Sequence, residues 1–393
     1  MPAPPIETLD RAHALIGSGQ AADAVVVLQA LVEQFPDSLE AWFTLGQAQG
    51  MLERQPQAEF AFLQAARLRP DMPEAHFNVA LALAYQNKLR DSLPSFVAAR
   101  KLNPDIPGLD ETLLQVLLEV LQDEHELDCG ANTEFPPLAE APLVSVIIPT
   151  QNRVSMLEDA LVSVCRQSYR NWEAIVVNDG GEDVSALVKS MPADVADRIS
   201  CFQLARASGQ AHARNTGLSA ARGALIAFLD DDDLFKSNHL EILVAGLQGG
   251  GAALGYTRAE GVWERLDAGG RVILKRGPAT PWLRYSRAAL LVRNAMPLQN
   301  CAVRRECFER FGNFDESLTC AEDWELLLRF SAIVDFRQLL EMTTEIHVRG
   351  DEIDSVSKRN RLRPMCELFY RMYPASGHAL VELARELYLK SLS

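Results

Sequence analysis

Residues 224–233 read Ala-Leu-Ile-Ala-Phe-Leu-Asp-Asp-Asp-Asp, and this stretch decides the fold of the larger part of the chain. Six consecutive apolar residues are too few for a helix and predict a strand that is buried on both faces. Four carboxylates follow at the end of that strand, where open α/β sheets bind their ligands. Adjacent carboxylates repel one another unless a cation lies among them, and hard divalent cations prefer oxygen ligands. The stretch therefore predicts a metal site at the edge of a sheet, with a solvated acidic turn as the alternative.

Strands and helices alternate around this stretch. Apolar runs and helical patterns follow one another at 143–149, 155–167, 172–177, 199–204 and 210–221. Ser155 and Glu158 fit a capping box at the start of the first helix. Such alternation predicts a mostly parallel sheet that helices cover on both faces. Polar loops follow three strand ends, at 150–152, 178–180 and 230–233.

The rest of this sheet domain is less regular. Residues 252–258 and 271–275 predict a pair of strands around a Gly269-Gly270 turn. Residues 321–330 predict a helix, because acidic residues fill its first turn. Two amphipathic helices follow, at about 361–373 and 377–392. We expect them to pack on the sheet domain; the alternatives are that they close the interface with the N-terminal part or lie on a membrane.

A 34-residue repeat occupies the N-terminal part. Pro36, Pro70 and Pro104 each end a helical stretch and precede an Asp. Three sets of equivalent positions hold residues of similar character: Ala24, Ala58 and Ser92; Leu28, Phe62 and Phe96; Leu31, Ala65 and Ala99. With the W-x-x-L-G motif at 42–46, the pattern resembles the tetratricopeptide repeat. The resemblance implies an all-α solenoid of three helix pairs and a capping helix. It also implies that this solenoid as a whole recruits a protein partner. The alternative to a solenoid is an ordinary helical bundle. The alternative to recruitment is a role in self-association or in stabilising the chain.

Bulk composition limits the function classes. The chain has 38 Lys and Arg against 53 Asp and Glu, and its net charge of −15 argues against nucleic acid as the main partner. Seven cysteines lack metal-ligand spacing and suit free thiols in a reducing compartment. There is no secretory signal pattern, and no apolar run approaches the ~18 residues that cross a bilayer. We therefore expect a cytoplasmic protein with at most peripheral membrane contact.

These features divide the chain into four parts. The repeat domain occupies 1–127, a linker rich in proline occupies 128–142, the sheet domain occupies 143–355, and C-terminal helices occupy 356–393. The linker is identified by three prolines and the absence of periodicity.

Four motifs of the sheet domain occur together. They are VSVIIPTQNR at 144–153, VVNDGG at 176–181, ARNTGLSAARGALIAFLDDDD at 213–233 and RFGNFDESLTCAEDWELLLR at 310–329. In this order and spacing they resemble the family 2 glycosyltransferases of the GT-A fold. The resemblance covers residues 143–349 and implies a Rossmann-like mixed α/β sheet. It also implies transfer of a sugar from a nucleotide-sugar, a UDP-sugar, to a saccharide, lipid-linked glycan or protein.

The resemblance also implies the donor-binding residues. Four residues at the end of the first strand and directly after it would surround the base: Pro149, Thr150, Gln151 and Asn152. Asp179 would accept a hydrogen bond from a base N–H such as that of uracil, with a plain turn aspartate as the alternative. Two positions depart from the family pattern, because Gln151 stands where Tyr is usual and Asn178 stands where Asp is usual.

The acidic run matches the family's D-x-D motif. The match implies a Mn²⁺ or Mg²⁺ ion that Asp232 and Asp230 hold against the two phosphates of the donor. Asp230 or Asp231 would face the ribose or a metal-bound water, and the run of four leaves the register open by one residue. His347 would reach the diphosphate or the metal, and Arg214 would help to hold the donor. Structural roles are the alternatives for both residues.

Asp323 matches the catalytic Asp of the family's E-D motif. An acceptor hydroxyl needs its proton removed as it attacks the sugar, and a carboxylate at a helix start can act as that base. The implied outcome is a single displacement with inversion. The alternative is that Glu322 and Asp323 only stabilise the N-terminus of their helix.

Two other functions compete with this one. In the first, the sheet domain is a catalytically weak scaffold and the repeats form the working surface. In the second, the chain is a nucleotidyltransferase, for which a Gly-rich basic loop after the first strand is expected. Residues 150–153 read Thr-Gln-Asn-Arg and do not form such a loop.

Overall fold

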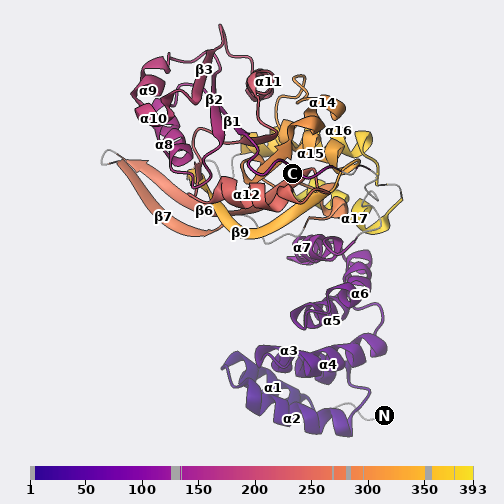
Figure 1. Ribbon diagram of the computed structural model, residues 1–393. Coiled ribbons are helices and arrows are strands. Elements are labelled where there is room, and N and C mark those ends of the chain that lie inside the picture. The colour runs from indigo at the N-terminus through magenta and orange to yellow at the C-terminus, as the bar shows by residue number, and fades with distance from the viewer. Residues whose placement is uncertain are drawn as a thin grey trace. The chain divides into compact units, whose positions relative to one another are not determined.

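The chain folds into two compact units, Met1–Leu121 and Gln122–Ser393 (Figure 1). The structure is a computed structural model that describes residues 5–124, 133, 135–267, 270–279, 285–294, 296–349, 356–375 and 377–392. Gly269 of the expected turn, and residues 128–132 and 134 of the expected linker, lie outside the described residues. No described helix is both long enough and apolar enough to span a bilayer.

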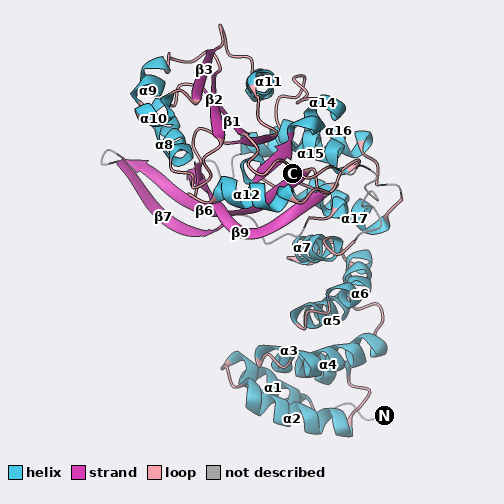
Figure 2. Cartoon of the chain, viewed as in Figure 1, coloured by secondary structure: helices cyan, strands magenta, loops and turns pink. Residues whose placement is uncertain are grey.

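The first unit consists of helices that pack on their neighbours in the chain (Figure 2). They are α1 (Ile6–Gly17), α2 (Ala21–Gln34), α3 (Leu39–Met51), α4 (Gln55–Leu68), α5 (Pro73–Tyr85), α6 (Leu89–Leu102) and α7 (Leu109–Leu121). A Cβ on Gly46 of α3 would lie 2.6 Å from the Phe62 ring of α4, so glycine allows the close approach of these paired helices. The expected solenoid of three helix pairs and a capping helix is confirmed.

One interaction of the middle repeat recurs in the third with a different side chain. Trp42 donates its indole N–H to the carbonyl of Pro36 over 2.8 Å. His76, at the equivalent position, makes the same bond from Nε2 to the carbonyl of Pro70 over 2.8 Å. Because a carbonyl only accepts, Nε2 of His76 carries the proton. A ring N–H at this position therefore ties each helix to the segment before it.

A single mixed sheet organises the described part of the second unit. Its strands follow the order β3-β2-β1-β4-β8-β6-β9-β5, and β7 pairs with β6. They are β1 (Val144–Thr150), β2 (Trp172–Asn178), β3 (Ile199–Gln203), β4 (Leu225–Phe228), β5 (Leu234–Phe235), β6 (Leu254–Asp267), β7 (Gly270–Pro278), β8 (Cys301–Arg304) and β9 (Phe336–Arg349). β1 to β4 pair in parallel, whereas β8 is antiparallel to both β4 and β6. The expected mixed α/β sheet is confirmed, and the carboxyl ends of β1, β2 and β4 share one edge.

Helices connect and cover these strands. They are α8 (Val154–Cys165), α9 (Ser185–Ser190), α10 (Ala193–Ala196), α11 (Gln210–Ala220), α12 (His239–Gln248), α13 (Arg287–Leu290), the 3₁₀ turn η1 (Leu298–Asn300), α14 (Arg305–Phe311), α15 (Glu322–Ser331), α16 (Val356–Met372) and α17 (Ala379–Ser391). The expected capping box is wrong: α8 begins at Val154 with Arg153 as its N-cap, and no side chain caps it. Ser155 consequently lies inside the first turn. The sequence patterns did not predict α12 or β9.

The two C-terminal helices, α16 and α17, pack against other elements of the second unit, around α15. The Trp324 ring of α15 meets the Phe369 ring of α16 edge to face, with centroids 5.2 Å apart. Tyr370 donates its hydroxyl to the carbonyl of Val292 over 2.6 Å, and Arg385 of α17 donates to the carbonyl of Leu291 over 2.8 Å. Of the three arrangements considered from the sequence, the structure shows packing on the sheet domain. This packing holds α15, the helix that carries Asp323, in place.

Candidate active site

The acidic run alternates between buried and accessible carboxylates. It leaves the end of β4, which lies between β1 and β8. Asp231 and Asp233 are buried, at 5% and 3% exposure. The side chains of Asp230 and Asp232 keep 28% and 18% exposure. The run makes a turn, in which the N–H of Asp233 donates to the carbonyl of Asp230 over 3.1 Å, and the accessible pair has the D-x-D spacing.

The two buried aspartates hold the loops of the site together. Thr150, at the end of β1, donates its hydroxyl to Asp231 over 2.7 Å. Asp233 accepts the backbone N–H of His347 over 2.8 Å and also an N–H of the Gln299 side chain. Burial raises the pKa of both carboxyls, and it raises the pKa of Asp233 well above its usual range. Neither carboxylate is as available to a ligand as Asp230 and Asp232.

Arginines neutralise the accessible carboxylates. Arg153 lies 3.1 Å from Asp231 and 2.9 Å from Asp232 through the same nitrogen, Nη1. Arg349, at the end of β9, lies 3.2 Å from Asp232. The sequence patterns predicted no role for Arg153 or Arg349. The signal that could have found Arg153 is its place directly after the polar loop 150–152.

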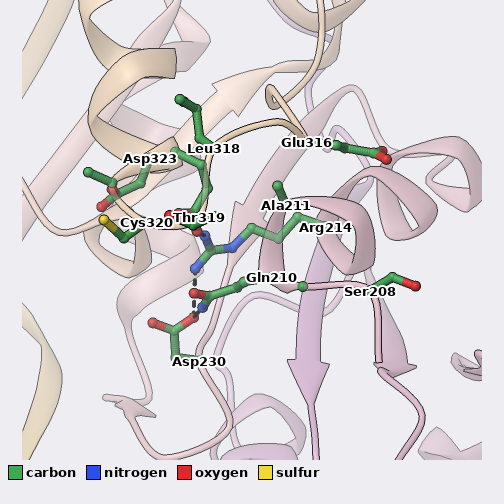
Figure 3. Close-up of a pocket in the computed structure, with 13 residues that line it drawn as sticks. Ser208, Gln210, Ala211, Arg214, Asp230, Glu316, Leu318, Thr319, Cys320 and Asp323 are labelled. Atoms are coloured by element: carbon green, nitrogen blue, oxygen red, sulfur yellow. Dashed lines mark hydrogen bonds and ion pairs between the residues drawn. The ribbon is translucent and has the colours of Figure 1, made fainter. Parts of the chain in front are cut away.

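A pocket of about 480 Å³ opens beside Asp230 (Figure 3). Its lining comes from the start of α11, the acidic run and the loop before α15: Ser208, Gly209, Gln210, Ala211, Arg214, Asp230, Glu316, Leu318, Thr319, Cys320, Ala321, Glu322 and Asp323. The guanidinium of Arg214 lies 2.9 Å from Asp230 and 2.7 Å from Glu322. Gln210 also donates to Asp230, over 3.1 Å. The pocket thus brings Arg214, Asp230 and Asp323 together, as expected for one site.

Asp323 is held as a weakly acidic carboxyl at the wall of this pocket. One oxygen accepts the backbone N–H of Trp324 over 2.7 Å, and the other accepts an N–H of Asn294 over 3.0 Å. Burial, and then the charge of Glu322, raise the pKa of Asp323 to about 6, while the charge of Arg214 opposes the shift. A carboxylate with this pKa is ionised at neutral pH and is a stronger base than an ordinary aspartate.

Asn215 fixes the loop that leads to Asp323. It follows Arg214 on α11, and its side chain bonds both the N–H and the carbonyl of Phe314. Ala321, the residue before α15, has a φ of 59°, which is uncommon for a residue with a side chain. Backbone outliers of this kind persist where the surroundings hold them, and they cluster at functional sites.

The expected base-binding residues lie together at the ends of β1 and β2. Pro149 and Thr150 are the last two residues of β1, and Gln151 donates to the carbonyl of Asp179 over 2.8 Å. Asn152 has a φ of 56° and accepts the backbone N–H of Glu182. The structure thus assembles these four residues and Asp179 at one edge of the sheet.

Asp179 is more heavily engaged than expected. Its two carboxylate oxygens accept the backbone N–H groups of Ser208 and Gly209, over 2.7 and 2.8 Å. Gly180 makes this contact feasible, because its φ is +72° and a Cβ there would lie 2.3 Å from the nitrogen of Ala207. Asp179 therefore holds the loop before α11, and each oxygen keeps a second lone pair for a ligand.

His347 points one ring nitrogen at a buried carboxylate. Its Nδ1 lies 3.0 Å from Glu264, which is fully buried. Because a carboxylate only accepts, Nδ1 carries a proton. Nε2 is buried and has no hydrogen-bond partner among the described residues; it lies 3.8 Å from Glu345. A carboxylate partner at Nδ1 is the usual companion of a histidine that binds a metal through its other nitrogen.

Comparison with known proteins follows the division into two units. The profile "Glycosyl transferase family 2" matches residues 145–291, and the profile "Tetratricopeptide repeat" matches residues 9–75. The uncharacterized glycosyltransferase YwdF of Bacillus subtilis is 30% identical over 197 residues, which are 49% of this chain and 69% of YwdF. The UDP-Glc:alpha-D-GlcNAc-diphosphoundecaprenol beta-1,3-glucosyltransferase WfgD of Escherichia coli is 38% identical over 103 residues, 26% of this chain and 40% of WfgD.

Other matches extend beyond this chain or share its fold. The chain spans 20% and 40% of the length of two further curated glycosyltransferases that it matches. Among solved structures, the mannosyltransferase PcManGT from Pyrobaculum calidifontis, in complex with GDP-Man and Mn²⁺, covers 72% of this chain and 82% of its own. The TM-score is 0.50 at 15% identity, which shows a common fold.

Proposed function

The chain belongs to glycosyl transferase family 2, and we propose that it transfers a sugar with inversion from a nucleotide-sugar to a saccharide, lipid-linked glycan or protein. The observation that carries the proposal is the pocket in which Asp230, Arg214 and Asp323 meet. It joins the D-x-D motif, an arginine and a carboxyl whose pKa is raised to about 6. A UDP-sugar is the proposed donor, because the name of WfgD specifies UDP-Glc.

Asp323 is the proposed general base. It would take the proton of an acceptor hydroxyl while the hydroxyl oxygen forms a bond to the anomeric carbon of the sugar. The bond from that carbon to the donor's phosphate breaks on the opposite face, which inverts the configuration. Asn294 and Trp324 hold the carboxylate in place through the two hydrogen bonds described above. These bonds leave each oxygen one further lone pair for the acceptor proton.

Asp230 and Asp232 are the proposed ligands of Mn²⁺ or Mg²⁺, since PcManGT, which shares the fold, was solved in complex with Mn²⁺. Partly exposed carboxylates suit such hard cations, and the unpartnered Nε2 of His347 is a further donor atom. No three His, Cys, Asp or Glu side chains of the described ranges form a ready site, so donor phosphates would complete the coordination. The ion would neutralise charge on the departing diphosphate. Asp231 is proposed to face the ribose.

Recruitment of a protein, as acceptor or assembly partner, is the proposed role of the repeat unit. Its support is the match to the tetratricopeptide profile, because such solenoids offer extended binding surfaces. A cytoplasmic location stays a prediction, supported by the free cysteines of the described residues. In the alternative function, the sheet domain is a catalytically weak scaffold, and the repeats still recruit a protein partner.

Substitution of Asp323 tests the proposal. Full-length protein would be screened with a panel of nucleotide-sugars for hydrolysis and transfer, with and without Mn²⁺. Asp323→Asn should lower transfer by about 10²–10⁴-fold, the usual contribution of a positioned base, and spare donor binding. Asp335→Asn, an exposed aspartate of the same unit, is the matched control. Near-normal transfer by Asp323→Asn would make Asp323 a structural residue, and failure to bind any donor would favour the scaffold.

A further inference from the structure

We propose that a second pocket, at the amino ends of the parallel strands, binds a small hydroxylated anion such as a sugar acid or a sugar phosphate. No step of the proposed sugar transfer uses this pocket, so the inference goes beyond the proposed function. We call it the amino-end pocket, and its lining consists of Leu143, Arg170, Asn171, Trp172, Glu173, Asp197, Arg198 and Arg222.

The sheet topology separates the amino-end pocket from the active site. The lining residues stand at or near the starts of four strands, β1, β2, β3 and β4, which begin at Val144, Trp172, Ile199 and Leu225. The polar loops and the acidic run of the active site follow the opposite ends of β1, β2 and β4. A strand rises about 3.3 Å per residue, so the seven residues of β1 put about 20 Å between the two edges.

Two arginines give the amino-end pocket an unbalanced charge. The side chains of Arg170 and Arg198 form no ion pair in the described part of the chain. The one acidic lining residue that is likewise unpaired, among the residues that the structure describes, is the exposed Asp197. The unpaired side chains therefore carry an excess of positive charge, although the whole chain has a net charge of −15.

The other two charged residues of the lining neutralise each other. Arg222 donates from Nε and Nη2 to Glu173, over 2.8 and 2.6 Å. Glu173 is buried, at 5% exposure, and also accepts the hydroxyl of Ser145 over 2.6 Å. Because Glu173 is committed to these partners, it leaves the charges of Arg170 and Arg198 unopposed.

Arg198 is held in position without a ligand. Its guanidinium carbon lies 5.4 Å from the centre of the Trp172 ring, and Nη1 donates to the backbone carbonyl of Arg170 over 2.7 Å. Trp172 is itself buried, at 2% exposure, so the ring is a fixed platform. An arginine that is already ordered loses less rotamer freedom when it binds an anion, which favours binding.

The lining also indicates the class of anion. Guanidinium groups bind carboxylates and phosphates through paired N–H groups. The carboxylate of Asp197 accepts hydrogen bonds, and so does Oδ1 of Asn171, whose amide nitrogen donates to the carbonyl of Ala141. Such acceptors suit hydroxyl groups. The volume of about 450 Å³ is typical of a small-molecule site, so an oxyanion on a hydroxylated body matches the pocket.

The alternative is that Arg170 and Arg198 are solvated surface residues without a ligand. The two interpretations differ in their response to small anions at constant ionic strength. Solvated arginines would give no saturable binding. A binding site would saturate, and substitutions of opposite charge would change its affinity in opposite directions.

Tryptophan fluorescence of the full-length protein measures binding, because Trp172 lies against Arg198. Titrations use glucuronate, glycerol phosphate and neutral glucose, without added metal. Glucuronate or glycerol phosphate should change the emission saturably, whereas glucose should not. The anion that binds more tightly identifies the group that the pocket prefers, a carboxylate or a phosphate. Saturation-transfer NMR on the carbon-bound protons of each probe reports binding independently of the tryptophans.

Four variants locate the binding site. Arg170→Gln and Arg198→Gln should each weaken anion binding about 10-fold, as loss of a charge-assisted hydrogen bond does. Asp197→Asn removes a negative charge from the lining and should strengthen anion binding about 3-fold. Arg67→Gln changes an exposed arginine of α4 in the first unit and is the matched control, which should bind as the wild type.

Arg170→Gln is the decisive variant. Its side chain makes no hydrogen bond or ion pair with any described residue, so the substitution should leave the temperature of thermal unfolding unchanged. Wild-type protein that binds neither anion in both measurements would overturn the inference. Arg170→Gln and Arg198→Gln proteins with wild-type affinity would also overturn it, because the anion would then bind elsewhere.

Discussion

Asn215 and Phe314 are 99 residues apart, and the side-chain amide of Asn215 bonds both backbone polar groups of Phe314 over 3.0 Å. This pair joins α11, which carries Arg214, to the loop that carries the chain into α15 and Asp323. Asn215→Ala leaves the buried N–H and carbonyl of Phe314 unpaired. We expect a loss of about 1–3 kcal/mol in the free energy of unfolding. We also expect a fall of about 10- to 100-fold in kcat, because a small displacement of a catalytic group is costly.

Thermal unfolding and steady-state transfer rates measure these two effects. Ser219→Ala is the control, because its exposed hydroxyl bonds only a carbonyl within α11. A destabilised Asn215→Ala protein with normal kcat would show that the loop position does not govern catalysis.

Transfer should depend on the ionisation of Asp323. Its pKa is raised to about 6, so the base is lost as the pH falls through that value. We expect kcat/KM to be constant above about pH 7 and to fall about tenfold for each pH unit below 6. The negative charge of Glu322 raises the pKa of Asp323. Glu322→Gln removes that charge, so it should lower the pKa of Asp323 and move this acidic limb to lower pH. A limb near pH 4, or one that Glu322→Gln leaves in place, would assign the titration to another group.

The register of the acidic run can be tested with neighbouring substitutions. Asp232→Asn should weaken the binding of UDP with Mn²⁺ by at least about 10- to 100-fold, because even the loss of an outer-shell partner of a metal ligand costs that much. Asp233→Asn should bind nearly as the wild type, because Asp233 is buried and its oxygens already accept the N–H of His347 and an N–H of Gln299. An asparagine oxygen can still accept the N–H of His347. Calorimetry that found the reverse order would shift the metal-binding pair by one residue.

Removal of residues 1–137 tests the role of the repeats. If they recruit the acceptor, the shortened protein should bind and hydrolyse the donor normally but show a raised KM for its natural acceptor. Transfer to that acceptor at the full-length rate would refute recruitment. A shortened protein that is insoluble would favour the stabilising role.

The parts of the fold that were predictable have local signals. The parallel strands β1, β2 and β4 are buried along their lengths, so they read as short apolar runs. The solenoid was predictable because its helices contact their neighbours in sequence. Each repeat therefore needs small and large residues at the same positions, and this recurrence is visible in the sequence. β9 was missed because only a few of its residues are buried, and its period is therefore weak.

The candidate site was predictable only where residues follow a strand end or begin a helix. Asp230 and Asp323 occupy such places. Arg153 and Arg349 reach Asp232 across 79 and 117 residues, and no local pattern records an ion pair of that span. The alternation of buried and accessible aspartates was equally hidden, because it depends on β9 and on Gln299.

The bond between Asp233 and His347 gives the site an order of assembly during synthesis. The acidic run leaves the ribosome 114 residues ahead of His347. Until β9 follows, the four carboxylates lack both that N–H and the guanidinium of Arg349. The repeats, whose contacts are between successive helices, are complete long before then. A nascent chain halted before residue 347 would therefore carry finished repeats and an acidic run without its anchor, so that the proposed recruitment of a partner would not have to wait for the sheet domain.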